Sequence, residues 1–405
     1  MLDGSHHDQI WALKDQSNGQ PLLGCGACLD RQVCGGLHTL NGGADAISCM
    51  SMCRCEDQAR CDYVCPNAPR RYRLRLTEVS GWELDNIPLA SEVPLPDLPD
   101  AVALIEGNVV GPRPIRDFDY VAFPLSLGFR HRGAQVRAKK SRELQQSFGA
   151  APSQGWIASG VERDSFVERM WRLPQPKQAF EALKQAGVVF ATSPNYSTYA
   201  DSPRHDNLHA MKRIAWTWFH MVEAGIPTAL HINGRTDHDF KRWANFAARQ
   251  KNLKAVAFEF LTGAEPVEDG RRYVARLIDF VKTSGRSDLL LVIRGGPQWA
   301  DELRSHFSQV ILLDAGPYFK TVKRQRLEVN QHGKLSYIRH TTKTPSEMRA
   351  LLRHNVNSKM AIYAAKRSPA LQGELDLFVD LTPSKTLSPL QVEADHKASQ
   401  LDLFP

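Results

Sequence analysis

From about residue 101 onward, short apolar runs alternate with longer amphipathic segments. The runs are rich in β-branched residues, as in strands buried on both faces, and the segments between them have helical periodicity. The pattern predicts seven or eight strands, at Val102–Ile105 or Tyr120–Phe123, Trp156–Ser159, Val188–Ser193, Thr228–Asn233, Ala255–Phe260, Leu289–Arg294, Val310–Asp314 and Leu335–Arg339.

The segments between these runs carry helix start and stop signals. Clear helices are expected at Asn207–Ala224 before Gly225, at Asp237–Gln250 after the capping candidate Thr236, and at Glu268–Thr283 near Gly285. This alternation favours an α/β protein with a TIM-barrel-like (β/α)8 core over residues 100–366. Residues 1–99 would form a Cys-rich metal-binding module with a Pro-rich linker, and residues 367–405 a flexible tail after the helix Pro345–Lys366.

Alternation within the strands predicts a polar pocket at the C-terminal mouth of the barrel, where barrel enzymes hold their catalytic groups. Asp314 is assigned to the same face as Arg294, and Ser193 and Asn195 to the face opposite Phe190. Each residue also has a structural interpretation, such as a buried histidine, an ion pair or a loop cap. The predicted catalytic residues are His231, Glu259, Arg294 and Asp314, and the predicted substrate-binding residues are Ser193, Asn195, Tyr196 and Asn233.

In such a site, Glu259 or Asp314 would act as general base or nucleophile. His231 would act as acid or base, and Arg294 would bind a phosphate or carboxylate.

All eight cysteines lie between Cys25 and Cys65. Such a cluster in a reducing compartment indicates a metal site, and the run Cys61 to Pro66 is similar to the closing half of a ferredoxin motif. A [4Fe-4S] cluster and a pair of Zn²⁺ sites with four thiolates each both fit the count. A radical S-adenosylmethionine cluster fits less well, because Cys49, Cys53 and Cys55 lack the Cys-x3-Cys-x2-Cys spacing. The predicted metal ligands are Cys25, Cys28, Cys34, Cys49, Cys53, Cys55, Cys61 and Cys65.

The chain has a formal charge of +7, with 51 Lys and Arg residues against 44 Asp and Glu. This excess permits polyanion binding, and a basic run with one aromatic ring is what a phosphate backbone and an unstacked base would require. A solvated surface explains such a run as well, and a second run at Arg130–Arg142 has the same ambiguity. The predicted nucleic-acid-binding residues are Arg70, Arg71, Tyr72, Arg73 and Arg75.

No apolar stretch reaches the roughly 18 residues of a membrane helix, and the first residues lack the apolar core of a secretion signal. We therefore expect a cytoplasmic protein that has no membrane partner.

Residues 155–243 resemble an uncharacterised family of phage and mobile-element proteins that is typed only as a domain of unknown function. The resemblance is carried by Trp156-Ile157-Ala158, Asp164-Ser165-Phe166, Ser193-Pro194-Asn195-Tyr196-Ser197-x-Tyr199, Asp201-x-Pro203 and Gly225-Ile226-Pro227. Similar proteins usually have an acidic residue and Phe where Asn195 and Tyr196 stand. If that acidic residue is catalytic, Asn195 puts catalysis in question. The resemblance implies a barrel-like fold and a mobile-DNA context, and it supplies no reaction.

The chain ends in a short motif, Gln400, Leu401, Asp402, Leu403 and Phe404, followed by Pro405. It resembles the peptide with which many bacterial replication and repair proteins bind the DNA polymerase sliding clamp. An extended tail can dock in a groove with Leu403 and Phe404 as apolar anchors. The alternative is a tail that folds back on the barrel.

These observations lead to three hypotheses. The first is a metal-cluster protein of phage or mobile-element DNA metabolism, whose barrel binds or processes a nucleic-acid-related substrate and whose tail recruits it to the clamp. The second is a non-enzymatic DNA or replisome adaptor, and the third is a small-molecule barrel enzyme. A polar, concave mouth would favour an enzyme, and a mouth filled by apolar side chains would favour the adaptor.

Overall fold

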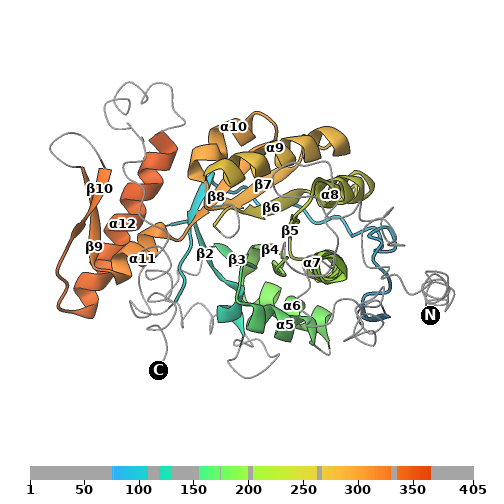
Figure 1. Cartoon of the computed structure of the whole chain (residues 1–405). Helices are drawn as coiled ribbons and strands as arrows, with labels where there is room; N and C mark the ends of the chain where they lie inside the picture. Colours follow the sequence, from blue (N-terminus) through green and yellow to red (C-terminus); the bar gives the residue numbers. More distant parts are fainter. Residues whose placement is uncertain are drawn as a thin grey trace, which may run out of the picture.

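Eight parallel strands form a barrel in the computed structural model, which describes residues 75, 77–107, 118–129, 155–173, 175–198, 204–261, 267–329 and 335–365 (Figure 1). Each strand pairs with its neighbours in chain order. The barrel closes between the first two strands, where Leu104 bridges Ala122 and the Ile105 amide donates to the Ala122 carbonyl over 2.9 Å. The predicted α/β, TIM-barrel-like fold is confirmed. The strands are β1 (Ala101–Ala103), β2 (Tyr120–Pro124), β3 (Gly155–Ser159), β4 (Val188–Thr192), β5 (Thr228–His231), β6 (Ala255–Glu259), β7 (Leu290–Arg294) and β8 (Gln309–Asp314).

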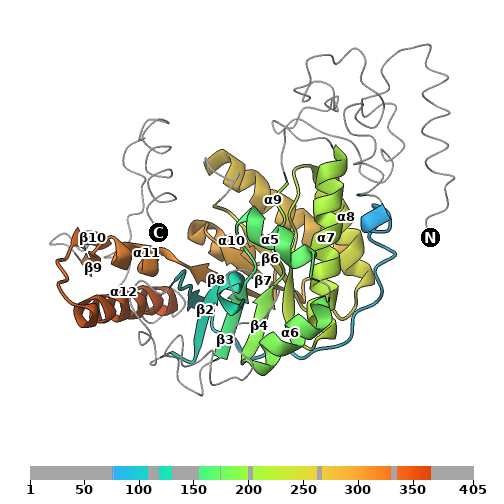
Figure 2. The same cartoon turned by 90° about the horizontal axis from the view of Figure 1, so that it is seen from below.

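Helices between the strands cover the outside of the barrel (Figure 2). The capping prediction at Thr236 is confirmed, because its side chain accepts from the Asp239 amide and the Asp239 carboxylate accepts from the Thr236 amide. The helices that follow the strands are η3 (Leu125–Gly128), α5 (Asp164–Trp171), α6 (Pro176–Gln185), α7 (Arg204–Glu223), α8 (Asp237–Arg249), α9 (Val267–Ser284), η4 (Pro297–Trp299), α10 (Ala300–Arg304) and α11 (Gly316–Val322).

The strand predicted at Leu335–Arg339 does not belong to the barrel. It is β10, which pairs antiparallel with β9 (Gln325–Val329) in a separate two-stranded ribbon. Both of the first two candidate segments are strands, so β1 to β8 already complete the barrel. The ribbon and α12 (Pro345–Ala365) stand together on one side of the barrel (Figure 1).

Two apolar layers hold the barrel together. The interior is filled mostly by small and medium side chains, since strand after strand contributes residues such as Ala229, Ala257, Val292 and Leu313. Outside it, larger residues pack beneath the helices, with Trp218, Trp243 and Phe258 among them. On the outer face of β1, Ala103 packs with Leu352 and Val356 of α12.

The segment 77–99, expected as part of a module and linker, has a packed course along the barrel. The Ala90 amide donates to Gln250 Oε1 over 3.0 Å, and Gln250 Nε2 donates to the Pro88 carbonyl over 2.7 Å. Leu98 is buried with the interior cluster. We call residues 77–99 the strap.

Several sequence predictions fall outside the described residues. They are the eight cysteines, the basic residues 70–73, the second basic run and the clamp-like tail. Within the described part of the chain, no helix is long and apolar enough to span a membrane, and no group of His, Cys, Asp or Glu gathers as a metal site.

Candidate active site at the barrel mouth

A cavity of about 210 Å³ lies where β4, β5 and β6 end. It has the volume of about seven water molecules. Polar side chains predominate among its lining residues, which are Asn195, Ser197, Thr198, His231, Asn233, Arg235, Ala257, Phe258 and Glu259.

His231 is the best-defined group in this cavity. Its Nδ1 hydrogen bonds to the Ser193 carbonyl, so Nδ1 carries the proton, and its backbone amide donates to Ser193 Oγ over 2.9 Å. Burial, against the opposing effect of the Ser193 bond and with a small contribution from the Arg294 charge, lowers the pKa of His231 to about 4. The imidazole is therefore neutral at physiological pH, with Nε2 as its basic nitrogen.

The neighbouring wall is a network of amides. Asn233 Nδ2 donates to Asn195 Oδ1 over 2.9 Å and to the Tyr196 carbonyl over 3.0 Å. Thr198 Oγ1 donates to Asn233 Oδ1 over 3.1 Å, and Arg235 Nε donates to the Thr198 carbonyl over 2.8 Å. These bonds fix the loop after β4 against the loop after β5.

The loop after β3 approaches this wall closely at Gly160. The Gly160 amide donates to Thr192 Oγ1 over 2.8 Å, and the Asn195 amide donates to the Gly160 carbonyl over 2.9 Å. A Cβ at position 160 would lie 2.2 Å from the Ser193 carbonyl oxygen, so only glycine fits.

Next to the cavity, Arg294 organises two carboxyl groups that the sequence analysis missed. Arg294 Nη2 lies 2.5 Å from Glu106 Oε1, and Nη1 donates to the Val161 carbonyl over 3.2 Å. Burial raises the pKa of Glu106, and Arg294 opposes that shift. Glu162 Oε1 accepts from the Ser126 amide over 2.5 Å.

The pKa of Glu162 is raised to about 7, first by burial and also by the charge of Glu106. Its bonds to Ser126 and the charge of Arg294 oppose the rise. Since Arg294 acts on Glu106, Glu162 and His231, these groups form one electrostatic cluster at the mouth. A search for acidic residues just after each predicted strand would have found Glu106 and Glu162.

The structure brings four of the eight predicted site residues to the cavity: Asn195, His231, Asn233 and Glu259. Arg294 is the register partner of Glu259 and lies beside the cavity, where it forms its ion pair with Glu106. Ser193 is buried behind His231 and positions it. The chemical roles of these residues stay predictions.

Tyr196 does not line the cavity. Its side chain is 1% exposed and belongs to the outer core, its hydroxyl lies 3.4 Å from Thr217 Oγ1, and the Arg213 guanidinium stacks 4.3 Å from its ring centroid. Burial raises its pKa to about 12. The prediction that the Tyr196 side chain binds substrate is therefore wrong. This side chain packs in the outer core under the loop after β4.

The placement of Asp314 at the mouth is also wrong. Its neighbour Leu312 packs in the outer layer, while Leu313 belongs to the interior cluster. Asp314 accepts from the Gly316 amide over 2.7 Å and from the Tyr363 hydroxyl of α12 over 2.8 Å. It is a cap and an anchor for α12, which is the structural role that the sequence left open.

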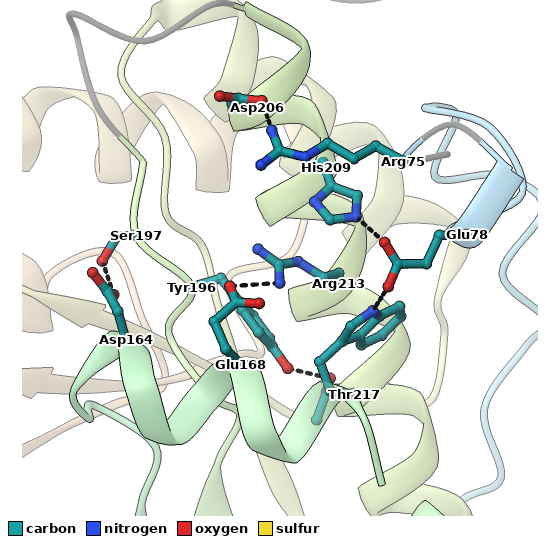
Figure 3. A network of polar contacts seen from close by, with 11 residues as sticks. Arg75, Glu78, Asp164, Glu168, Tyr196, Ser197, Asp206, His209, Arg213 and Thr217 are labelled. Atoms are coloured by element: carbon teal, nitrogen blue, oxygen red, sulfur yellow. Dashed lines mark hydrogen bonds and ion pairs between the residues drawn. The ribbon is translucent and has the colours of Figure 1, made fainter. Parts of the chain in front are cut away.

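Polar contacts join the strap to α5 and α7, next to the loop after β4 (Figure 3). Glu78 accepts from Trp171 Nε1 over 2.5 Å and lies 2.9 Å from His209 Nε2. The Trp171 ring meets the Tyr196 ring edge to face at 6.4 Å. At the start of α7, Arg75 forms an ion pair with Asp206. The described chain thus begins on the mouth side of the barrel.

No protein-family model matches the sequence, and the comparison with curated proteins found no match. Among solved structures, the chain is similar to one described as a "putative lyase/mutase" from Burkholderia cenocepacia J2315. The identity is 13% and the TM-score 0.31, over 62% of this chain and 88% of that chain. A likeness this slight assigns no function, and the barrel is identified from its strand order alone. The resemblance to the phage family stays a prediction.

Proposed function

We propose that the protein is a metal-cluster enzyme of phage or mobile-element DNA metabolism, whose barrel mouth performs acid–base chemistry on a nucleic-acid-related substrate. The observation that carries the proposal is the polar cavity at the ends of β4, β5 and β6, in which Ser193 fixes His231 and beside which Arg294 is paired with Glu106. A carboxyl group with a pKa near 7 can both take and give a proton at physiological pH, and a neutral imidazole offers its Nε2 as a hydrogen-bond acceptor.

In this proposal, His231 Nε2 accepts a hydrogen bond from the substrate, and the Ser193 carbonyl holds the ring by Nδ1. Glu162, whose pKa is about 7, takes a proton from the substrate and returns it at another position. Arg294 and Glu106 keep the charges of the cluster balanced while the proton moves.

This assignment answers the question raised by Asn195. The resemblance places an acidic residue at this position in similar proteins, but here the side chain is an amide bonded to Asn233. The acid role is therefore given to Glu162 on the neighbouring loop, and Asn195 is left to bind substrate.

The lining chemistry supports a small, polar ligand unit. Typical drug-sized sites span about 300–1,000 Å³, so a cavity of about 210 Å³ suits one base or sugar of a larger molecule. Asn195 and Asn233 offer amide groups of the kind that read the hydrogen-bonding edge of a base, and Arg235 offers a cation for a phosphate. A non-enzymatic adaptor was expected to have an apolar, filled mouth, so the polar cavity supports the enzyme.

The metal module and the clamp peptide are the other parts of the proposal. The cysteine pattern supports a [4Fe-4S] cluster or Zn²⁺, and the final residues support recruitment to the sliding clamp. Arg75 follows Cys65 by ten residues and forms its ion pair with Asp206, at the end of α7 that lies on the mouth side of the barrel. This contact supports a metal module that works next to the barrel site.

The test is calorimetric titration of full-length, metal-loaded protein with nucleobases, nucleosides and nucleoside monophosphates. At least one class should bind, and His231→Asn should weaken that binding tenfold or more, by about 1.4 kcal/mol. His306→Asn is the matched control, because His306 lies just before β8 at the opposite end of the barrel. Failure of every ligand, or equal binding by all variants, would remove the enzyme proposal.

Catalysis itself is tested with Glu162→Gln. Once a turned-over substrate is found, this variant should lose roughly 10²–10⁴ in rate at unchanged ligand affinity, because only proton transfer is removed. Glu302→Gln, an exposed change on α10, serves as its control.

A further inference from the structure

The β9–β10 ribbon and the residues that flank it are strongly basic. Between positions 320 and 343, the described residues carry six lysines and arginines against one carboxylate, Glu328. The formal charge of the whole chain is only +7, so this short segment has a large share of the basic excess. The cations are Lys320, Lys323, Arg324, Arg326, Arg339 and Lys343.

The ribbon is also held rigidly on one side. Leu327 is buried against α12, and Asn355 Oδ1 accepts from its amide over 2.8 Å. Asn355 Nδ2 donates to the Gln325 carbonyl over 2.8 Å, and His354 Nε2 lies 2.8 Å from the Leu327 carbonyl. A surface that is fixed before binding loses little entropy when a partner docks.

The register of the two strands identifies the face turned away from Leu327. Arg326 lies opposite Ile338, and the next pair on the same face is Glu328 with Ser336, where Arg326 Nε lies 3.4 Å from Glu328 Oε1. Because side chains alternate along a strand, these residues face away from the buried Leu327. Lys323, Arg324, Arg339 and Lys343 are exposed around the ribbon.

Exposed apolar side chains accompany these cations. Of the five large hydrophobic side chains that are exposed in the described part of the chain, three lie in or beside the ribbon, at Phe319, Val329 and Ile338. Val329 and Ile338 lie on opposite faces of the ribbon. They therefore do not form the single apolar face that binding to a lipid surface requires.

We propose that the β9–β10 ribbon is a DNA-binding element that contacts the phosphates of a duplex. A five-residue strand is about 17 Å long, and a two-stranded ribbon fits the major groove of B-DNA. The exposed cations around the ribbon supply the phosphate contacts, and the exposed Ile338 is placed to contact a base edge or a sugar. This inference rests on the proposed function in its choice of a nucleic acid as the polymer, but it does not depend on the chemistry of the barrel mouth.

The test uses a fluorescent 20-base-pair duplex, the full-length protein and anisotropy at several salt concentrations. The triple variant Lys323→Gln, Arg339→Gln and Lys343→Gln should bind about tenfold more weakly or worse near physiological salt. The slope of log K against log salt should become shallower by up to about 2.7, since each lost phosphate contact removes about 0.9.

A matched variant removes the same charge elsewhere. Lys241→Gln, Lys251→Gln and Lys282→Gln alter three exposed lysines on or just after α8 and α9. This variant should keep most of the affinity. Equal loss in the two variants would mean that only the net charge matters and would overturn the proposal, as would unchanged binding by the ribbon variant.

Two further measurements separate the DNA-binding ribbon from the proposed barrel site and from other binding partners. His231→Asn should bind the duplex normally, and the ribbon variant should still bind the ligand of the barrel cavity, so either proposal can fail alone. Vesicles containing anionic phospholipid and a labelled single strand are offered in parallel. A ribbon-dependent preference for vesicles over duplex would refute a DNA-binding ribbon, and tighter binding of the single strand would refute docking in the groove.

Discussion

Arg294 and Glu106 join the ends of two strands that are not neighbours in the barrel. Arg294 is the last residue of β7, and Glu106 lies just after β1, so β8 runs between their strands. Even so, Arg294 Nη2 lies 2.5 Å from Glu106 Oε1. Their side chains are only 14% and 19% exposed. A charge pair so poorly hydrated acts strongly on other titratable groups nearby.

The first prediction concerns this influence on Glu162. Removing the cation in Arg294→Met should raise the pKa of Glu162 above its value of about 7, because Arg294 now opposes the rise. Glu106→Gln should lower the same pKa, because the Glu106 charge contributes to it. Titration of ¹³C-labelled glutamate side chains by NMR measures both shifts. Movement in the same direction in the two variants would contradict the cluster.

The second prediction follows from the sign of the Glu162 shift. Its pKa is about 7 in the folded protein and about 4.5 in the unfolded chain. Between these values, the folded protein binds more protons, so the contribution of Glu162 to the free energy of unfolding falls as the pH rises from 4.5 to 7. Glu162→Gln should therefore gain stability relative to wild type over this interval, on the order of 2 kcal/mol after solvent screening.

Urea unfolding of the two proteins at pH 5 and pH 8 tests this difference. Glu302→Gln, which changes an exposed carboxylate on α10, is measured alongside as the control. A stability difference between wild type and Glu162→Gln that is constant with pH would show that Glu162 titrates normally.

The strand pattern alone was sufficient to predict the barrel and half of its mouth. On β5 and β6, the two faces differ, because small or polar residues such as Ala229 and Ala257 alternate with larger apolar ones. His231 and Glu259 follow the small residues, so their interior position could be predicted.

The same reasoning failed on β4 and β8, where both faces are apolar. Leu312 and Leu313 are both buried, one under the helices and one inside the barrel, so the sequence gives no sign of which face Asp314 shares. Phe190 likewise points into the interior rather than toward the helices. Asn195 reaches the cavity because it lies beyond the end of β4, where the Gly160 carbonyl fixes its amide.

The third prediction concerns the metal. Eight cysteines within residues 25–65 should load iron with sulfide, or zinc, and the metal should be needed for folding of this module. Anaerobic and aerobic preparations are assayed for iron, sulfide and zinc, and chelation is followed by limited proteolysis. Well-folded protein that contains none of the three would exclude the metal module.

The fourth prediction is that Gln400 to Phe404 bind the polymerase sliding clamp. A short extended peptide that becomes ordered on docking commonly binds with micromolar affinity, about −8 kcal/mol. Leu403→Ala with Phe404→Ala should abolish most of this binding, because such peptides concentrate their affinity in a few buried anchors. The double variant should keep its metal content and its barrel fold, since a terminal peptide adds little to a core.

Titration of purified clamp with the full chain, the double variant and a chain that ends before Ser399 tests recruitment directly. Only the full chain should bind with micromolar affinity. Equal affinity of all three proteins, or no binding by the full chain, would dismiss the clamp peptide. The sequence Glu374-Leu375-Asp376-Leu377-Phe378 is similar and provides an internal check. If binding were lost only on changing Leu377 and Phe378, the anchor would lie in that upstream copy, because the same apolar pair would then be filling the groove from a different point in the chain.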